Sequence, residues 1–145
     1  MEIEQLSIDN LKQLTELVLE LWIDCEFDEQ FENYKRILGS ESEICYLCKE
    51  AGDYIAFLHL SSRNDYVEGA KDLPIAYVEG IYVKSDFQKK GIAKKLMNYA
   101  ENWAKQKGYN QIASDTNITN SVSIDFHKQI GFAEIERIVC FIKDL

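Results

Sequence analysis

Apolar side chains recur along this chain with the two periods that distinguish strands from helices. Residues 1–6 alternate between apolar and polar side chains, which predicts a first strand. An amphipathic helix capped by Asp9 or Asn10 should follow, because the next apolar residues are spaced by three or four: Leu11, Leu14, Val18, Leu21 and Trp22. A second helix is expected to run through Tyr34 to Gly39.

The middle of the chain predicts a β-hairpin. Residues 44–50 and 54–60 are rich in apolar and aromatic side chains, and Gly52-Asp53 between them is a turn signal. Residues 63–69 are polar and should form a loop that leads to the next strand.

The stretch from residue 74 to residue 104 organises the rest of the fold. Residues 75–83 are β-branched and aromatic, which predicts a strand. After a short polar break, a helix should begin behind Gly91 and end near Gly108. Its apolar face is formed by Ile92, Leu96, Ala100 and Trp103.

The last third should add one helix and three short strands. Residues 111–114 form the first strand, which leads to Asp115. Asn120 or Ser121 caps a helix whose apolar stripe is Val122, Phe126 and Ile130. Residues 133–136 and 138–142 are the last two predicted strands. The order of elements predicts an α/β fold in which helices cover both faces of a mixed sheet.

Composition limits the class of protein. A chain of 145 residues is long enough for a single domain, residues 1–145, with a sizeable core. The net charge of −9 argues against a nucleic-acid partner, which requires a basic patch, and permits a cationic small molecule. The sequence has neither a leader pattern nor an apolar run of membrane-spanning length, so we expect a cytoplasmic protein without a membrane partner.

The four cysteines do not predict a metal site. Cys45 and Cys48 form the one Cys-x-x-Cys pair, and their odd separation in a strand directs the two side chains to opposite faces. No second pair or nearby histidine accompanies them. We therefore expect buried free thiols in a reducing compartment and no bound metal.

The polar break at residues 88–93 reads Gln-Lys-Lys-Gly-Ile-Ala and is suited to an anion. A glycine and a small residue at a helix start let backbone N–H groups approach a phosphate, and the helix dipole favours negative charge. The spacing fits neither the Walker loop nor the dinucleotide fingerprint. The same residues also fit an ordinary turn into a helix.

Two signatures resemble those of the GCN5-related N-acetyltransferase (GNAT) superfamily. Gln-x-x-Gly-x-Ala after a strand is similar to the pyrophosphate loop of that family. Its second signature has an asparagine, a small residue three positions on, an acid seven positions on and then Gly-Phe, which is matched here by Asn120, Ser123, His127, Gly131 and Phe132. The resemblance implies the GNAT fold and acetyl-CoA as co-substrate.

The resemblance also implies roles for individual residues. In the family the pantetheine arm pairs with the central strand, and a bulge in that strand directs an N–H group at the thioester oxygen. We expect that bulge at Gly80-Ile81. The implied cofactor-binding residues are Ile81, Tyr82, Val83, Gln88, Lys89, Lys90, Gly91, Ile92, Ala93 and Asn120. His127 stands where the family more often has a tyrosine as proton donor to the thiolate, and a purely structural histidine is an equal alternative.

Further short matches resemble the aminoglycoside 6'-N-acetyltransferases. They are Asp-Tyr-Val at 65–67, Val-Glu-Gly-Ile-Tyr-Val at 78–83, Ala-Ser-Asp-Thr at 113–116 and the Glu136-Arg137 pair. The resemblance implies a cationic aminoglycoside as substrate, bound by Trp22, Cys25, Tyr66, Glu79, Asp115 and Glu136. It leaves a homodimer open.

The chemistry of these residues agrees with an acetyl transfer to an amine. Glu79 and Asp115 end two neighbouring predicted strands, where carboxylates would attract and orient a polycation. Attack requires a neutral amine, and Glu79 is the candidate proton acceptor, with orientation alone as the competing role. The alternatives are a GNAT enzyme for another cationic amine, such as a polyamine or a protein N-terminus, and a module that binds acyl-CoA or drug without turnover.

Overall fold

A computed structural model describes all residues from 1 to 145. The strands are β1 (Glu2–Gln5), β2 (Glu43–Glu50), β3 (Asp53–Arg63), β4 (Ile75–Val83) and β5 (Ile112–Ser114). The helices are α1 (Leu11–Leu21), α2 (Phe27–Lys35), α3 (Ile92–Gln106) and α4 (Ser121–Gln129), with a 3₁₀ turn, η1 (Ser85–Phe87), before α3. None of the helices is both long and apolar enough to cross a membrane.

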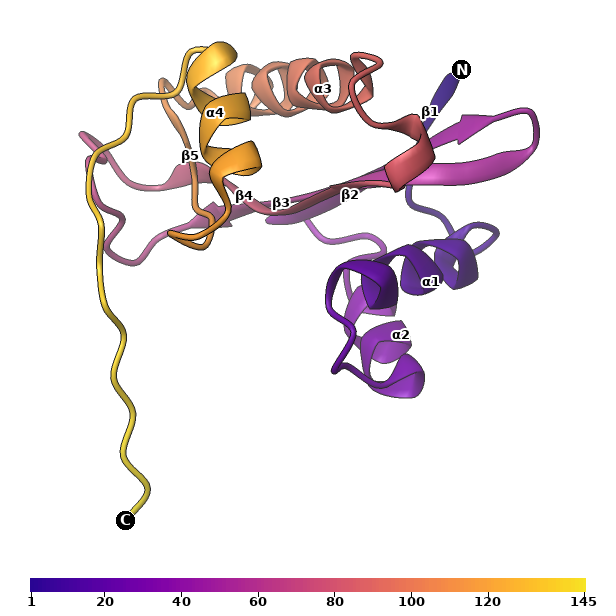
Figure 1. Cartoon of the computed structure of the whole chain (residues 1–145), viewed down its shortest axis with the longest axis horizontal. Coiled ribbons are helices and arrows are strands. Elements are labelled where there is room, and N and C mark those ends of the chain that lie inside the picture. Colours follow the sequence, from indigo (N-terminus) through magenta and orange to yellow (C-terminus); the bar gives the residue numbers. More distant parts are fainter.

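The strands form one sheet in chain order, β1-β2-β3-β4-β5. The first four strands are antiparallel, and β5 is parallel to β4. Helices α1 and α2 lie on one face of this sheet, while α3 and α4 lie on the other (Figure 1). This arrangement confirms the mixed sheet with helices on both faces.

Each face of the sheet has its own apolar core. Leu96, Met97 and Ala100 of α3 pack against Leu58 and Leu60 of β3. On the opposite face, the apolar stripe of α1 packs against Cys45, Leu47 and Phe57, together with Tyr34 of α2. Because side chains alternate along each strand, the sheet contributes residues to both cores. Burial of these apolar side chains holds the helices in place relative to β4.

The cysteines follow the strand alternation only in part. Cys45 and Cys48 are buried in the two opposite cores, as their odd separation predicts. The expectation of buried thiols is wrong for the other two, because Cys25 is only partly buried and Cys140 is exposed. Cys140 belongs to the segment that follows α4, which forms neither helix nor strand.

The β2–β3 hairpin turns one residue earlier than predicted. Ala51 and Gly52 have φ angles of 50° and 89°, and Asp53 already belongs to β3. Two successive left-handed residues are typical of the turn that matches the twist of a two-residue hairpin. The strand is also longer than predicted and continues through Ser61 to Arg63.

The prediction of two final strands is wrong. Residues 132–145 form no helix or strand, and the C-terminal part of this yellow segment extends away from the body in Figure 1. Ile138, Phe141 and Ile142 are 65%, 92% and 97% exposed. Residues 138–142 are five consecutive apolar residues, as in a buried strand, but no neighbouring strand pairs with them, which is why the local pattern misled.

Candidate active site

The central feature of the site is the point where β4 and β5 part. The parallel pairing covers only Ala76–Val78 of β4 and Ile112–Ser114 of β5. Beyond Val78, β4 remains paired with β3 on one side but has no strand on the other. The edge of β4 at Ile81, Tyr82 and Val83 is therefore open, and an extended ligand can add there like a strand, although the Val83 carbonyl already accepts from Gln88.

A helix start with free N–H groups follows this open edge. Gly91 is the N-cap of α3 at φ 81°, no side chain caps the helix, and no acidic residue lies in its first turn. A Cβ atom added at Gly91 would have no neighbour within 4 Å. The N–H groups of Ile92 and Ala93 in the first turn have no hydrogen-bond partner in the protein and therefore suit a phosphate.

The loop before α3 is shaped by its own bonds. The Gln88 side-chain amide donates to the Val83 carbonyl oxygen at 2.9 Å, which ties the loop to the end of β4. Lys89 has a φ angle of 61°, and the Lys90 ammonium lies 5.3 Å from the centre of the Phe87 ring. Both lysines add positive charge beside the helix start, which favours an anion.

A bulge interrupts β4 one residue before the predicted position. His59 of β3 pairs with Gly80 and Leu60 pairs with Val78, so Glu79 is the additional residue on β4. A Cβ atom at Gly80 would lie 2.8 Å from the Trp22 ring, so glycine is required for this close approach. The bulge therefore places Glu79 and Trp22 beside the open edge of β4.

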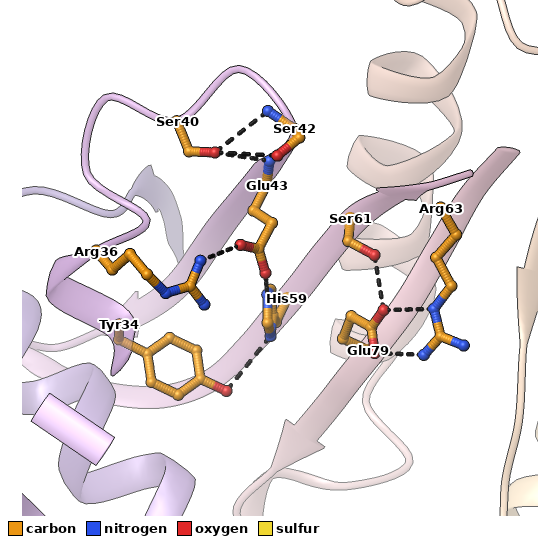
Figure 2. A network of polar contacts seen from close by, with 9 residues as sticks. All are labelled: Tyr34, Arg36, Ser40, Ser42, Glu43, His59, Ser61, Arg63 and Glu79. Atoms are coloured by element: carbon orange, nitrogen blue, oxygen red, sulfur yellow. Dashed lines mark hydrogen bonds and ion pairs between the residues drawn. The ribbon is translucent and has the colours of Figure 1, made fainter. Parts of the chain in front are cut away.

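Glu79 is held by the neighbouring strand β3 (Figure 2). Arg63 donates from Nε to Oε1 at 2.8 Å and from Nη2 to Oε2 at 2.7 Å, and Ser61 Oγ donates to Oε1 at 2.6 Å. Burial alone would raise the pKa of Glu79, but the bonds from Arg63 and Ser61 outweigh it and lower that pKa. The carboxylate is therefore ionised and fixed in direction.

Asp115 lies next to Glu79 through the strand register. Val78 pairs with Ser114 in the parallel ladder, so the two acids follow paired residues on neighbouring strands. The Tyr77 hydroxyl donates to Asp115 Oδ2, and burial together with this bond raises the pKa of Tyr77. Asp115 itself is exposed, which leaves its second oxygen open to a ligand.

Arg63, Ser61 and Tyr77 were not among the predicted site residues. The Arg63 guanidinium carbon lies 3.5 Å from the centre of the Tyr77 ring, so the cation also connects the two acids. A period of two does place Ser61 and Arg63 on the same face as His59. That signal could have been used if the predicted strand had not ended at residue 60.

His127 is occupied by the protein on both ring nitrogens. Its Nδ1 lies 2.7 Å from the Ser123 carbonyl oxygen, and its Nε2 lies 2.8 Å from Ser114 Oγ. A carbonyl only accepts, so Nδ1 carries a hydrogen, and Nε2 shares a hydrogen bond with the Ser114 hydroxyl. Phe126 and Phe132 pack edge-on against the ring, an arrangement that favours the structural alternative.

The remaining predicted residues lie around this centre. Asn120 caps α4 by accepting from the Ser123 N–H at 3.1 Å, so its side-chain oxygen is already used. Cys25 is partly buried just after α1, and its N–H donates to the Trp22 carbonyl. Tyr66 is 78% exposed and donates to Glu68 at 3.0 Å.

Glu136 lies at the base of the extended segment. It is exposed, and it is close enough to Tyr66 that its charge adds to the effect of the Glu68 bond, which raises the pKa of Tyr66. The neighbouring Ile135 side chain lies 3.1 Å from a Cβ placed on Gly69, so this part of the segment still contacts the loop after β3.

The fold and site thus combine an open strand edge, a free helix start and a bulge bearing a carboxylate. The acetyltransferase (GNAT) family model matches residues 8–132, and the chain therefore belongs to the GNAT acetyltransferase family. This confirms the resemblance found in the two sequence signatures.

Within that family the chain is similar to aminoglycoside N(6')-acetyltransferases. It is 35% identical to the type 1 enzyme of Serratia marcescens, over 94% of each chain. It superposes on AAC(6')-Iy in complex with a bisubstrate analogue, CoA-S-monomethyl-acetylneamine, with a TM-score of 0.94 at 30% identity over 99% and 98% of the chains. For AAC(6')-IG of Acinetobacter haemolyticus the TM-score is 0.92 at 32% identity, over 100% and 99%.

Proposed function

We propose that this enzyme transfers an acetyl group from acetyl-CoA to the 6'-amino group of aminoglycosides and thereby confers resistance. One observation carries the proposal: Glu79 and Asp115 lie side by side where β4 parts from β5. Anionic side chains thus stand beside the edge that suits the pantetheine arm, so a polycation and a thioester would meet there. We place the reaction in the cytoplasm, where acetyl-CoA is available.

The residues present fit acetyl-CoA. The first turn of α3 and Lys89 and Lys90 would hold the pyrophosphate, while Ile81 and Val83 would bond the pantetheine amides along the open edge of β4. The bulge after Val78 frees backbone N–H groups near the thioester, one of which would bond the carbonyl oxygen as it gains negative charge.

Transfer then proceeds by direct attack in a ternary complex. The neutral 6' nitrogen attacks the thioester carbon, the C–N bond forms, and the C–S bond breaks as CoA leaves as a thiolate. The nitrogen loses one proton and the thiolate gains one, so the products are the amide and free CoA. Direct transfer needs no cysteine nucleophile: Cys45 and Cys48 are buried, Cys140 lies on the extended segment, and the resemblance assigns Cys25 to the drug and not to the thioester.

Glu79 orients the amine and remains our candidate to accept its proton through water. Its two oxygens already accept three hydrogen bonds, and a lowered pKa makes it a weaker base. Orientation is therefore the role that the geometry favours. His127 is our candidate proton donor. For that role the ring must carry a hydrogen on Nε2 as well, which it would donate to Ser114 Oγ while the Ser114 hydroxyl passes its own proton to the thiolate.

A thiol-release assay across amines tests the proposal. Release of CoA thiol should occur with neamine and with larger aminoglycosides that bear a 6' amine. Turnover of spermidine or of an N-terminal peptide with a higher kcat/KM would support a GNAT enzyme for another amine. Binding of acetyl-CoA and neamine without thiol release would instead show a binding module.

We also propose that the enzyme works as a homodimer. The segment from residue 138 to residue 145 exposes apolar side chains and makes no backbone hydrogen bond, while β5 ends the sheet with one edge unpaired. An apolar, strand-like segment and an open strand edge on the same chain complement each other between two copies.

Sedimentation tests the dimer. Replacing Phe141 and Ile142 together by aspartate should convert a dimer to a monomer, because both side chains would be buried against the partner copy. Ile8→Asp changes an exposed apolar residue outside the segment and serves as control. A wild-type monomer at micromolar concentration, or a variant that stays dimeric, would contradict this part of the proposal.

A further inference from the structure

A positive charge stands between the two carboxylates that are expected to receive a cationic drug. Arg63 forms the two-bond pair with Glu79 that Figure 2 shows. It also stacks on Tyr77, whose hydroxyl bonds Asp115, and thereby reaches the neighbourhood of that acid. With Glu79 and Asp115 ionised, the three charges sum to −1 rather than −2. The positive charge of Arg63 therefore weakens the electrostatic attraction between the centre of the site and a polycationic drug.

The loss has a chemical benefit for acyl transfer. A carboxylate close to an ammonium group raises the pKa of that ammonium, whereas a nearby cation lowers it. Only the neutral amine attacks a thioester. Two uncompensated acids would therefore bind the acceptor amine in its unreactive, protonated form.

We propose that Arg63 is a positioning residue that fixes Glu79 and keeps the acceptor amine unprotonated in the bound drug. This inference rests on the proposed function and deepens it. Asp115, which has no cationic partner in direct contact, takes a drug ammonium, and the Glu79–Arg63 pair takes the amine that reacts. Glu79 then accepts a hydrogen bond from a neutral amine and does not form an ion pair with an ammonium.

The contacts of Arg63 suit this role better than those of a mobile lysine would. The planar guanidinium bonds both oxygens of Glu79 and stacks on the Tyr77 ring, so its position is defined from two sides. Ser61 bonds the same carboxylate from a third direction. The side chain of Arg63 is nonetheless 38% exposed, so its charge acts on whatever occupies the open face of the sheet.

Other titratable groups on this face do not produce the same effect. The titratable groups that face the Glu79–Arg63 pair are Tyr34, His59, Tyr77 and Asp115. Burial raises the pKa of both tyrosines and lowers that of His59, so these three are neutral near pH 7.5. Arg63 is then the only one of these side chains that carries positive charge where the drug binds.

Kinetics as a function of pH give the first test. In Arg63→Gln the KM for neamine should fall, because one cation is gone, while kcat near pH 7 should fall about tenfold. The acidic limb of the kcat profile should move up by about one pH unit, so that activity recovers at high pH. In Arg63→Lys the acidic limb of the kcat profile should lie close to its position in the wild type. Arg36→Gln, which breaks the exposed Arg36–Glu43 pair, is the matched control.

The double variant Arg63→Gln with Glu79→Gln separates charge from structure. It removes both members of the pair, so the net charge of the site returns to that of the wild type. Its acidic limb should return toward the wild-type position even if kcat stays low. A single variant whose KM rises and whose limb does not move would show that Arg63 is merely structural, and would overturn the inference.

Proton counting tests the inference without turnover. Calorimetry in two buffers of different ionisation enthalpy gives the protons released when a drug binds the CoA complex. The difference in release between neamine and its counterpart with a 6' hydroxyl isolates the 6' amine. That difference should be large in the wild type and small in Arg63→Gln, and equal values would overturn the inference. Absence of thiol release by the wild type would contradict the proposed function alone.

Discussion

The close contact between Trp22 and Gly80 allows a test of how the bulge shapes the substrate site. In Gly80→Ala the new Cβ would lie 2.8 Å and 3.4 Å from two Trp22 ring atoms and 3.5 Å from Phe57. The first distance is too short for a real contact, so the Trp22 ring must move. Since Trp22 is 37% exposed at the edge of the core, the ring can swing outward.

The structure sets the size of the effect. Overpacking a core costs about 1–3 kcal/mol, and an indole that can move toward solvent places this change near the lower end. A loss of about 1 kcal/mol corresponds to a fall in Tm of roughly 2–5 °C for a chain of this length. The KM for neamine should rise, whereas the affinity for acetyl-CoA should change little, because the helix start at Gly91 is untouched.

Thermal unfolding and thiol-release kinetics measure both consequences. Trp22→Phe removes the atoms that clash, so the double variant Gly80→Ala with Trp22→Phe should be more stable than the sum of the single changes predicts. Additive effects would mean that Trp22 does not cover Gly80. An unchanged KM in Gly80→Ala would place Trp22 outside the substrate site, whatever its effect on Tm.

Three further predictions concern the cofactor, the drug and the fold. Gly91→Glu puts a carboxylate into the open space before α3 and should severely weaken the binding of acetyl-CoA measured by calorimetry. Gly108→Glu is the control, because Gly108 has a similar φ of 82° and equally open space. Equal affinities of the two variants for acetyl-CoA would contradict the phosphate site. Asp115→Asn removes a charge-assisted bond of about 1.5–3 kcal/mol and should lower kcat/KM for aminoglycosides about 10- to 150-fold, so wild-type values would exclude a contact. Burial lowers the pKa of His59, so its contribution to stability is present above about pH 6.5 and is lost as the pH falls through the lowered value. The Tm of His59→Gln should therefore depend less on pH than that of the wild type between pH 7 and 5, and parallel curves would contradict this assignment.

Local patterns were sufficient to predict the strand and the helix between which the expected cofactor loop lies. The spacing of apolar residues after Gly91 and the β-branched and aromatic residues before the loop are local patterns within a few residues. They were therefore enough to predict α3 and β4 from the sequence. That Glu79 and Asp115 lie in or directly after neighbouring strands also followed, although Glu79 lies in the middle of β4 and is brought to Asp115 by the pairing of Val78 with Ser114. Short-range periodicity is thus informative wherever one element carries the function.

Contacts between strands could not be predicted in the same way. The pairing of His59 with Gly80 places the bulge at Glu79, and it also brings Arg63 onto the carboxylate. A one-residue change in register would have placed different side chains together, and no local pattern specifies it. The prediction for the last segment, residues 133–145, was wrong for a related reason. A strand-like pattern does not specify which sheet edge the segment pairs with, or whether that edge belongs to the same chain or to a second copy.

The position of the new acetyl group tests the central claim most directly. Neamine and its counterpart with a 6' hydroxyl share their rings, so an acidic surface should attract both to a similar extent. An un-ionised hydroxyl attacks a thioester far more slowly than a neutral amine. We predict that nuclear magnetic resonance and mass spectrometry of the neamine product will show one acetyl group on the 6' nitrogen, and that the hydroxyl compound will act as a competitive inhibitor with little turnover. Efficient acetylation of the hydroxyl compound on another ring nitrogen would contradict the 6' assignment.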